Sequence, residues 1–257
     1  MHALWTGSLS FGLITIPVTL YSASKERALD FSMLHKDDLG PISYKKICKK
    51  DGHEVAHQDI VKGFEYREGE YVVLDADDFK RASADKSETI DIEEFVLAEE
   101  IDPKFYEKPY YLEPGKGADK AYVLLREALA QEKRVAVARM VFRQKEDLVI
   151  VRSDGDILLL NQLRYLDEIR DTKELEVPGH VELSRKEIEM GVELIEKMHG
   201  KFKPEKYHDS YIENLEKVIR AKAKGEKLKP IPKVSKTAEP TDLVEQLRAS
   251  LERSKSA

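Results

Sequence analysis

The sequence predicts a mixed β/α fold, in which a β-barrel or β-sandwich core with one capping helix precedes a helical C-terminal segment. Apolar and polar residues alternate over much of residues 1–182, as side chains do on the two faces of a strand. One segment inside this region, and most of the chain after Pro178, repeats its apolar residues at the helical spacing of about 3.6 residues. A chain of 257 residues is long enough to bury a substantial core.

The strands of the core are predicted from this alternation. From Trp5 to Leu13 apolar residues alternate with Thr, Ser and Gly, and the phase then flips so that Ile14 and Ile16 are apolar. Such a flip indicates a bulge or a bend. Further strands are predicted at residues 71–75, 89–96, 135–143, 148–152 and 157–163, which Gly, Asp and Pro residues bound.

Three helices are predicted from their apolar stripes. The segment "DKAYVLLREALAQEKR", which begins at Asp119, forms the helix that caps the sheet. Residues 183–224 form a helical arm, in which Ser184 and Glu187 make a capping box at the start and Gly225 follows the end. The stripes of its two helices are Ile188, Gly191, Ile195 and Met198, and Tyr211, Leu215, Val218 and Ile219.

The C-terminal end is predicted to hold a linker and a short helix. Residues 225–240 carry three prolines and several lysines, a composition typical of an extended, solvated linker. In residues 241–257 Leu243, Val244, Leu247 and Leu251 share one helical face. A helix this short is marginal alone, so we expect it to need a partner surface.

Composition limits the class of protein. Charged residues make up 36% of the chain, no run of eighteen apolar residues occurs, and we expect no membrane partner. Cys48 is the only cysteine, so a reducing, cytoplasmic location is expected. The net charge of −6 conceals segregation, because residues 85–107 carry nine acids against two lysines and residues 217–236 carry eight bases against one glutamate.

Catalytic and metal sites are weakly indicated. Cys48, His53 and His57, with Asp51 as a fourth residue, have a spacing that zinc ligands can adopt, but no paired Cys-x-x-Cys element is present. No phosphate-binding glycine-rich sequence occurs, and 49 acidic residues are too many to single out a catalytic pair. We therefore predict no enzyme, no cofactor and no metal, and keep a metal-dependent hydrolase as an alternative.

The stretch "VARMVFRQKEDLVIVR" (residues 137–152) is predicted to be a two-stranded ribbon with arginines on its outer face. Arg139 and Arg143 would lie on one face because side chains alternate along a strand. The opposite face is wholly apolar and should belong to the core; it consists of Ala136, Ala138, Met140 and Phe142.

Several motifs resemble the bacterial Ku family in their order along the chain. They are "WTGSLSFGLITIPVTLYSA", "IVKGFEYREGEYVVL", "PYYLEP", "LLNQLRYLDEIRD" and "KYHDSYIENLEKVI", and together they span nearly the whole chain. The resemblance implies a Ku-type β-barrel and a homodimer that closes into a ring around double-stranded DNA ends. It also implies that the protein recruits a multifunctional ATP-dependent DNA ligase for end joining, without catalysis of its own, in the cytoplasm at the nucleoid.

The resemblance implies roles for particular residues. A ring that accepts any break should contact phosphate with Lys and Arg rather than read bases. The ribbon would help to bridge the DNA, and the helical arm 183–224 would interlock the dimer. The DNA-binding candidates are Arg139, Arg143, Lys145, Lys45, Lys46, Arg152 and Arg126, each of which is otherwise an ordinary exposed cation. The ligase-binding candidates are Leu243, Leu247, Arg248 and Leu251, and the alternative is a helix folded back on its own core.

The chain departs from the family pattern at one place that bears on metal binding. Many relatives carry Cys-x-x-Cys-Gly where this chain has "CKKDG", so Asp51 replaces the second cysteine. This departure supports the prediction of no metal. A nucleic-acid-binding barrel without end specificity, including a single-stranded or RNA-binding barrel, stays open as a second alternative.

Overall fold

The computed structural model describes residues 1–25, 29–82, 88–143, 145–226 and 243–253. The chain divides into two compact units, Met1–Asp171 and Thr172–Ala257, whereas the sequence predicts a boundary after residue 182. The predicted linker 225–240 lies outside the described residues from position 227 onward.

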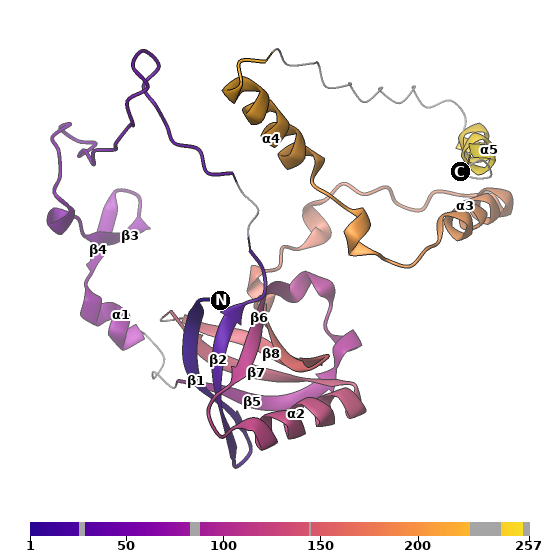
Figure 1. Cartoon of the computed structure of the whole chain (residues 1–257), viewed down its shortest axis with the longest axis horizontal. Helices are drawn as coiled ribbons and strands as arrows, with labels where there is room; N and C mark the ends of the chain where they lie inside the picture. The colour runs from indigo at the N-terminus through magenta and orange to yellow at the C-terminus, as the bar shows by residue number, and fades with distance from the viewer. Residues whose placement is uncertain (26–28, 83–87, 144, 227–242, 254–257) are drawn as a thin grey trace. The chain divides into compact units, whose positions relative to one another are not determined.

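A closed barrel forms the core of the first unit (Figure 1). Around the barrel the order is β1-β2-β6-β9-β8-β7-β5, and every neighbouring pair is antiparallel except β1 and β5. The prediction of a mixed fold with a β core is confirmed, as a barrel. Its strands in the described part are β1 (Ala3–Phe11), β2 (Ile14–Ser22), β5 (Thr89–Leu97), β6 (Tyr106–Pro114), β7 (Arg134–Phe142), β8 (Lys145–Asp154) and β9 (Ile157–Leu163).

The phase flip near the N-terminus is a hairpin turn rather than a bulge or bend. Phe11 pairs with Ile14, and the two residues between them form the turn that joins β1 to β2. Gly12 takes a φ of +59° there, a conformation that glycine adopts without steric cost. The turn reverses the chain, which is why the apolar positions change phase.

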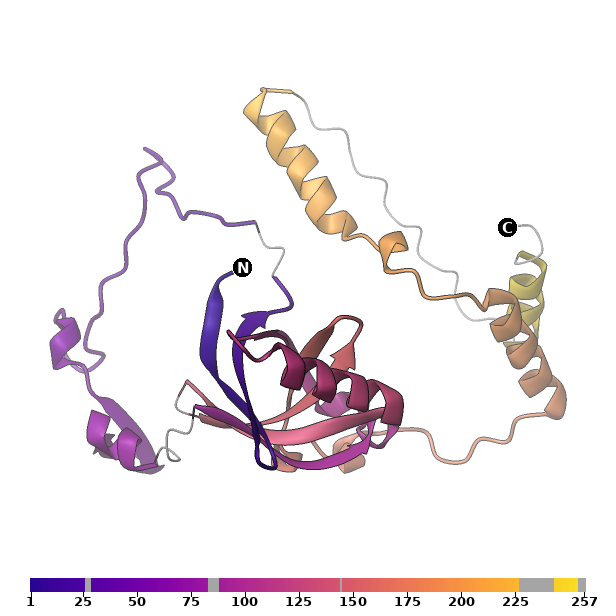
Figure 2. The ribbon, with the colours of Figure 1, turned by 60° about the horizontal axis from the view of Figure 1, so that its bottom comes forward.

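Helix α2 (Asp119–Glu132) covers part of the barrel, as predicted (Figure 2). It packs against β2, β7 and β8, and it buries Tyr122, Leu125 and Leu129 in the main hydrophobic cluster. The Tyr122 hydroxyl donates a hydrogen bond to the Leu112 carbonyl at 2.6 Å and accepts one from the Leu158 amide at 2.7 Å. Leu112 and Leu158 are register partners of β6 and β9, so one buried hydroxyl joins the helix to two strands.

The parallel pairing of β1 with β5 closes the barrel and is its shortest seam. Three register pairs make it, from Ser8↔Thr89 to Ser10↔Asp91, and the Ser8 amide also donates to the Glu88 carbonyl at 2.8 Å. A Cβ at Gly7 would overlap that carbonyl oxygen and the Trp5 ring. The backbones therefore approach closely here only because residue 7 is glycine.

An insertion of residues 23–88 separates β2 from β5. Its regular elements are β3 (Lys62–Arg67) and β4 (Glu70–Leu74), which form a two-stranded sheet, and the short helix α1 (Ala76–Ala82). The strand predicted at residues 71–75 is thus found, but outside the barrel. None of the residues of these three elements is fully buried. A two-stranded sheet without a core is at best marginally stable alone.

The second unit contains three α-helices in its described part: α3 (Arg185–Met198), α4 (Ser210–Ala223) and α5 (Leu243–Arg253). The capping box of α3 is confirmed, since the Glu187 amide donates to Ser184 Oγ at 3.3 Å and the Ser184 amide donates to Glu187 Oε2 at 2.7 Å. Gly225 follows α4 with a φ of +70°, as its predicted role requires. Helix α5 packs against α3 (Figure 2).

Candidate nucleic-acid interface

The predicted arginine ribbon is part of the barrel wall. Strands β7 and β8 pair with each other from Ala136↔Val151 to Phe142↔Lys145, but β7 also pairs with β5 and β8 with β9. The predicted apolar face is confirmed, because Ala136 and Ala138 are fully buried and Met140 is 3% exposed. Because β7 and β8 are each hydrogen-bonded to a barrel strand on either side, they do not form a separate arm. The ribbon is therefore part of the barrel surface.

Arg139 is already engaged with two carboxylates. Its guanidinium lies half-exposed on β7, with Nε 2.9 Å from Glu93 and Nη1 3.4 Å from Glu146. Glu93 comes from β5, where a register shift lies between Ile92 and Glu94. An exposed pair of this kind contributes little to stability, but it leaves the immediate surface negative rather than positive.

Arg143 does not continue the outer face that Arg139 begins. Strand β7 ends at Phe142, and Arg143 sits in the turn with a φ of +51°, its guanidinium 5.0 Å from the Phe142 ring centroid. The prediction that both arginines share one strand face is wrong, because the turn starts one residue earlier than expected. Arg143 and Lys145 instead line a cavity of about 370 Å³ that also contains four acidic residues, Glu107, Glu146, Asp147 and Glu168. Burial raises the pKa of Asp147 above its usual value.

Arg152 lies in a basic hollow. A shallow cavity of about 460 Å³ is lined by Arg152 of β8, Lys133 at the end of α2 and Arg134 at the start of β7, and none of the described residues that line it carries a carboxylate. Lys133 takes a φ of +53° as the left-handed cap of α2, and Arg134 Nη1 donates to the Phe95 carbonyl at 3.3 Å. Lys133 and Arg134 were not predicted. The "EKR" at the junction of a predicted helix and a predicted strand is the signal that points to them.

Arg126 has a structural role. Its side chain is 17% exposed, Nη1 donates to the Asp156 carbonyl at 2.7 Å, and the same guanidinium pairs with Glu127. It lines a cavity of about 650 Å³ beside α2. These bonds hold α2 to the β8–β9 turn, so a contact of Arg126 with DNA would require them to break.

Lys45 and Lys46 lie on a small hairpin of the insertion. Ile47 and Glu54 form its β-bridge, and Lys45 Nζ lies 2.7 Å from Glu54 Oε2. Lys46 is exposed and has no ion pair with any described residue, while its carbonyl accepts from the Val55 amide. Of this predicted basic pair, Lys46 is the residue with an uncompensated charge.

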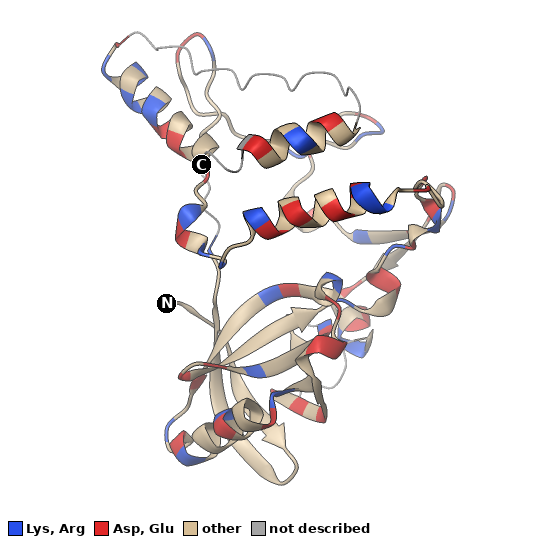
Figure 3. Ribbon diagram, turned by 90° about the vertical axis from the view of Figure 1, so that its right-hand side faces the viewer, with Lys and Arg blue, Asp and Glu red and all other residues tan. Residues whose placement is uncertain are grey.

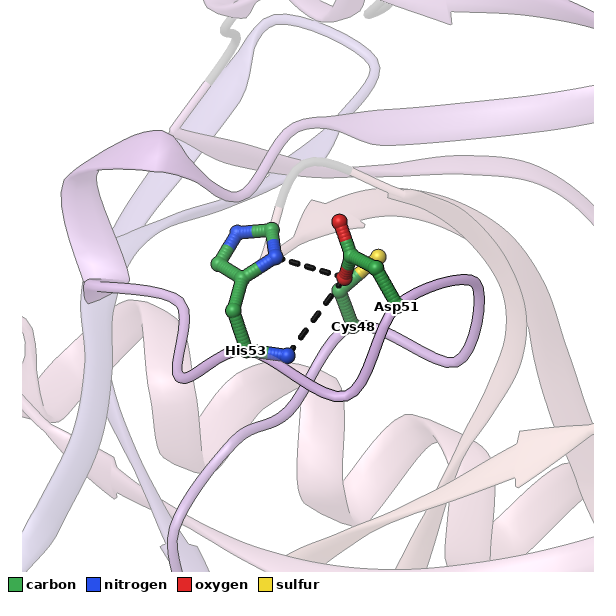
Figure 4. Close-up of side chains that lie close together, drawn as sticks. All are labelled: Cys48, Asp51 and His53. Carbon is green, nitrogen blue, oxygen red and sulfur yellow. Dashed lines mark hydrogen bonds and ion pairs between the residues drawn. The ribbon is translucent and has the colours of Figure 1, made fainter.

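The tip of the same hairpin brings three potential metal ligands together (Figure 4). A thiol, a carboxylate and an imidazole, those of Cys48, Asp51 and His53, lie within 4.8 Å of one another. Asp51 Oδ1 accepts hydrogen bonds from His53 Nδ1 at 2.5 Å and from the His53 amide at 3.4 Å. Hydrogen bonds from Cys48 and then His53 lower the pKa of Asp51. His57 is not part of this group.

The helices of the second unit carry charges of both signs (Figure 3). On α4 the acids Glu213 and Glu216 precede the bases Lys217, Arg220 and Lys222, an order that suits the helix dipole. The C-terminal end of α4 is therefore basic. Lys224 caps this end of the helix, and the predicted basic run lies outside the described residues from position 227 onward.

Helix α5 lies on the arm through the face predicted to bind a ligase. Leu251 is 9% exposed and Leu247 is partly buried, whereas Leu243 is 49% exposed and Arg248 is exposed. Helix α5 therefore packs on α3 within the second unit.

No helix in the described part of the chain has the length and apolar character needed to cross a bilayer.

The family described as "Ku: Ku70/Ku80 beta-barrel domain" matches residues 10–190. A solved structure, the SPOC domain of human PHD-finger protein 3, matches at a TM-score of 0.31 and 13% identity over 63% of this chain and 95% of that chain, too weak a likeness to carry an argument.

Three relatives are similar over almost the whole chain. The non-homologous end joining protein Ku of Opitutus terrae is 39% identical over 98% of this chain and 91% of its own length. Non-homologous end joining protein Ku 2 of Saccharopolyspora erythraea is 40% identical over 99% of this chain and 83% of its own. The corresponding protein of Heliobacterium modesticaldum is 39% identical over 99% of this chain and 93% of its own.

Proposed function

Because this chain belongs to the Ku family, we propose that it binds double-stranded DNA ends without sequence specificity as a ring-shaped homodimer. In this role it would recruit and stimulate an ATP-dependent DNA ligase in repair by non-homologous end joining, in the cytoplasm at the nucleoid. The family match carries the proposal, together with relatives that are named for end joining rather than for a catalytic activity.

Two segments outside the barrel support a homodimer. In the insertion, apolar side chains on both faces of the β3–β4 sheet are exposed, among them Phe64 at 64% and Val73 at 56%. On α3 the predicted stripe is also exposed, with Ile195 at 71% and Met198 at 74%. The barrel by contrast buries its apolar residues well. Large exposed apolar surfaces mark interaction sites, and a second copy of the chain would cover both.

Phosphate contacts would come from cations without a carboxylate partner. We assign Arg152, with Lys133 and Arg134 in the same hollow, and Lys46 on the insertion hairpin. Arg143 and Lys145 belong to the assignment as well, although acidic residues share their cavity. The other predicted residues, Arg139, Lys45 and Arg126, already bind carboxylates or a carbonyl, and we expect them to contribute less.

Specificity for ends would follow from topology. Contacts to phosphate carry no sequence information, so a closed ring would bind any duplex that it can enter. A broken duplex offers an entry point and a circular one does not. The acidic stretch of residues 85–107 would oppose binding of DNA outside the ring.

A mobility-shift comparison tests end binding. A linear duplex, the same duplex with both ends closed by hairpins, and a covalently closed circle of the same sequence are titrated with protein. We expect strong binding to the linear duplex and little to the circle; the hairpin-closed duplex shows whether the ring passes a closed tip. Equal affinity for linear and circular DNA would favour the barrel without end specificity. Light scattering in parallel should give the mass of a dimer.

A further inference from the structure

We propose that the hairpin tip formed by Cys48, Asp51 and His53 binds one zinc ion per chain. The observation is the convergence of three different donor types on one short turn, with all three donor atoms within 4.8 Å of one another. This inference concerns the insertion alone and is independent of how the protein binds DNA.

The backbone of the hairpin places the donors. The Cys48 amide donates to the His53 carbonyl at 2.8 Å, so these two residues face each other across the base of the turn. The Gly52 amide donates back to the Cys48 carbonyl at 2.8 Å, and Gly52 takes a φ of +77°, which brings Asp51 over the same side. Figure 4 shows the three side chains gathered above this turn. Their positions therefore follow from hydrogen bonds of the main chain.

The donor set and its dimensions suit zinc. In a tetrahedral site with Zn–S of about 2.3 Å and Zn–N or Zn–O of about 2.0–2.1 Å, donor atoms lie roughly 3.3–3.8 Å apart. The three donor atoms lie within 4.8 Å of one another, so the side chains would have to rotate to close the remaining distance. Sulfur and imidazole disfavour Mg²⁺ and Ca²⁺, which take oxygen ligands. The zinc ion would take the place of the proton in the hydrogen bond between His53 Nδ1 and Asp51. The Cys48 thiol would lose its proton to solvent and bind as a thiolate. A water molecule would fill the fourth coordination position of the ion.

Apart from its main-chain hydrogen bonds, the described part of the hairpin has little to stabilise it. The Ile47 side chain is 62% exposed, and the Lys45–Glu54 ion pair is exposed and thus weak. Two strands without a core are marginal in water, and a bound metal is a common way to stabilise such a small element. With zinc bound, the turn would hold Lys49 and Lys50 at its tip in one arrangement.

The replacement of a family cysteine by Asp51 led to the sequence prediction of no metal. The structure places the Asp51 carboxylate beside the thiol and the imidazole, where it substitutes for the missing sulfur with an oxygen. Carboxylate is an accepted zinc ligand, although a thiolate binds this metal more tightly.

Metal content and a cobalt spectrum test the proposal on the full-length protein. After dialysis against a weak chelator, we expect close to one zinc per chain by mass spectrometry of the elements. Cobalt substitution should give the visible bands of a tetrahedral ion and a near-ultraviolet thiolate-to-cobalt band. Cys48→Ser and His53→Gln should lower zinc affinity by more than the roughly 10–100-fold that changes around a site cost, and Cys48→Ser should abolish the thiolate band.

Two further variants make the test decisive. His57→Gln is the matched control and should retain the metal, because His57 is outside the group. Asp51→Cys should bind zinc more tightly than the natural chain. Wild-type protein that retains no zinc and shows no cobalt bands would overturn the proposal, as would zinc that survives Cys48→Ser or is lost in His57→Gln. Because the hairpin is outside the barrel core, unchanged thermal unfolding of the barrel verifies that each variant is folded.

Discussion

Neutralising Arg152 should weaken DNA binding in a way that depends strongly on salt. The structure distinguishes this arginine, in a hollow without carboxylates, from Arg139, which touches Glu93 and Glu146. Each phosphate contact contributes about 0.9 to the slope of log K against log salt concentration. A homodimer presents every side chain twice, so Arg152→Gln should reduce the slope by about 1.8.

This change is large enough to measure. Over a fourfold rise in salt, a slope difference of about 1.8 amounts to about 1.1 in log K, so wild-type affinity should fall roughly tenfold more than that of the variant. The assay is fluorescence anisotropy with a linear duplex long enough for one ring, repeated at several salt concentrations. Arg139→Gln is the matched control, and its slope should stay close to that of the wild type. An unchanged slope for Arg152→Gln, or an equal loss for Arg139→Gln, would refute the assignment of phosphate contacts by local charge.

Three other variants test the core, the barrel surface and the C-terminal helix. Tyr122→Phe removes the buried hydroxyl that donates to the Leu112 carbonyl and accepts from the Leu158 amide, and it should lower the free energy of unfolding by about 1–3 kcal/mol in urea denaturation. Tyr21→Phe is the control, because its hydroxyl bonds to the exposed Glu113, and it should change the free energy of unfolding little; equal effects would contradict this. Burial raises the pKa of Asp147 in the folded protein above its value in the unfolded chain. The free energy of unfolding should therefore fall as the pH rises from the unfolded-state pKa of Asp147 through its higher folded-state pKa. Asp147→Asn should therefore stabilise the protein at neutral pH and not in acid, and a gain of the same size in acid would disprove the cause. Leu247→Asp combined with Leu251→Asp should abolish ligase stimulation and preserve end binding; loss of both activities would show that α5 is needed for the fold instead.

Local patterns predicted most of the barrel. Strands β5, β7, β8 and β9 were predicted because their residues either alternate between apolar and polar or are uniformly apolar. Gly, Asp and Pro residues typical of turns bound these segments. Strand β6 escaped prediction because Pro109 and Pro114 argue against a strand; a register shift between Tyr106 and Pro109 accommodates the first of them. The insertion was invisible as a unit, since a strand pattern at residues 71–75 does not say which sheet the strand joins.

The candidate site was less predictable than the fold because charges are paired by tertiary structure. Glu93 forms its ion pair with Arg139 only because β5 pairs with β7. Lys133 and Arg152 line the same cavity only because α2 ends beside β8. The conformation of Arg143 depends on a turn that begins one residue earlier than the end of the predicted strand. Spacing singled out Cys48, His53 and His57, with Asp51 as a fourth residue, but only the fold of the hairpin shows that Cys48, Asp51 and His53 face one another and that His57 is outside this group.

The short seam between β1 and β5 has a mechanical consequence. The insertion leaves the barrel at Ser22 and returns at Thr89, and the strands at both of these points are bonded to β1. A load applied to the insertion, such as traction from a duplex being drawn away, would reach β1 from both sides, and also β6 through β2 and β7 through β5. The β1–β5 seam has three register pairs, against eight for β1–β2, five for β2–β6 and seven for β5–β7, so we expect it to yield first. The molecule would then release tension by opening from Ser8 to Ser10 of β1 while the other strands stay joined.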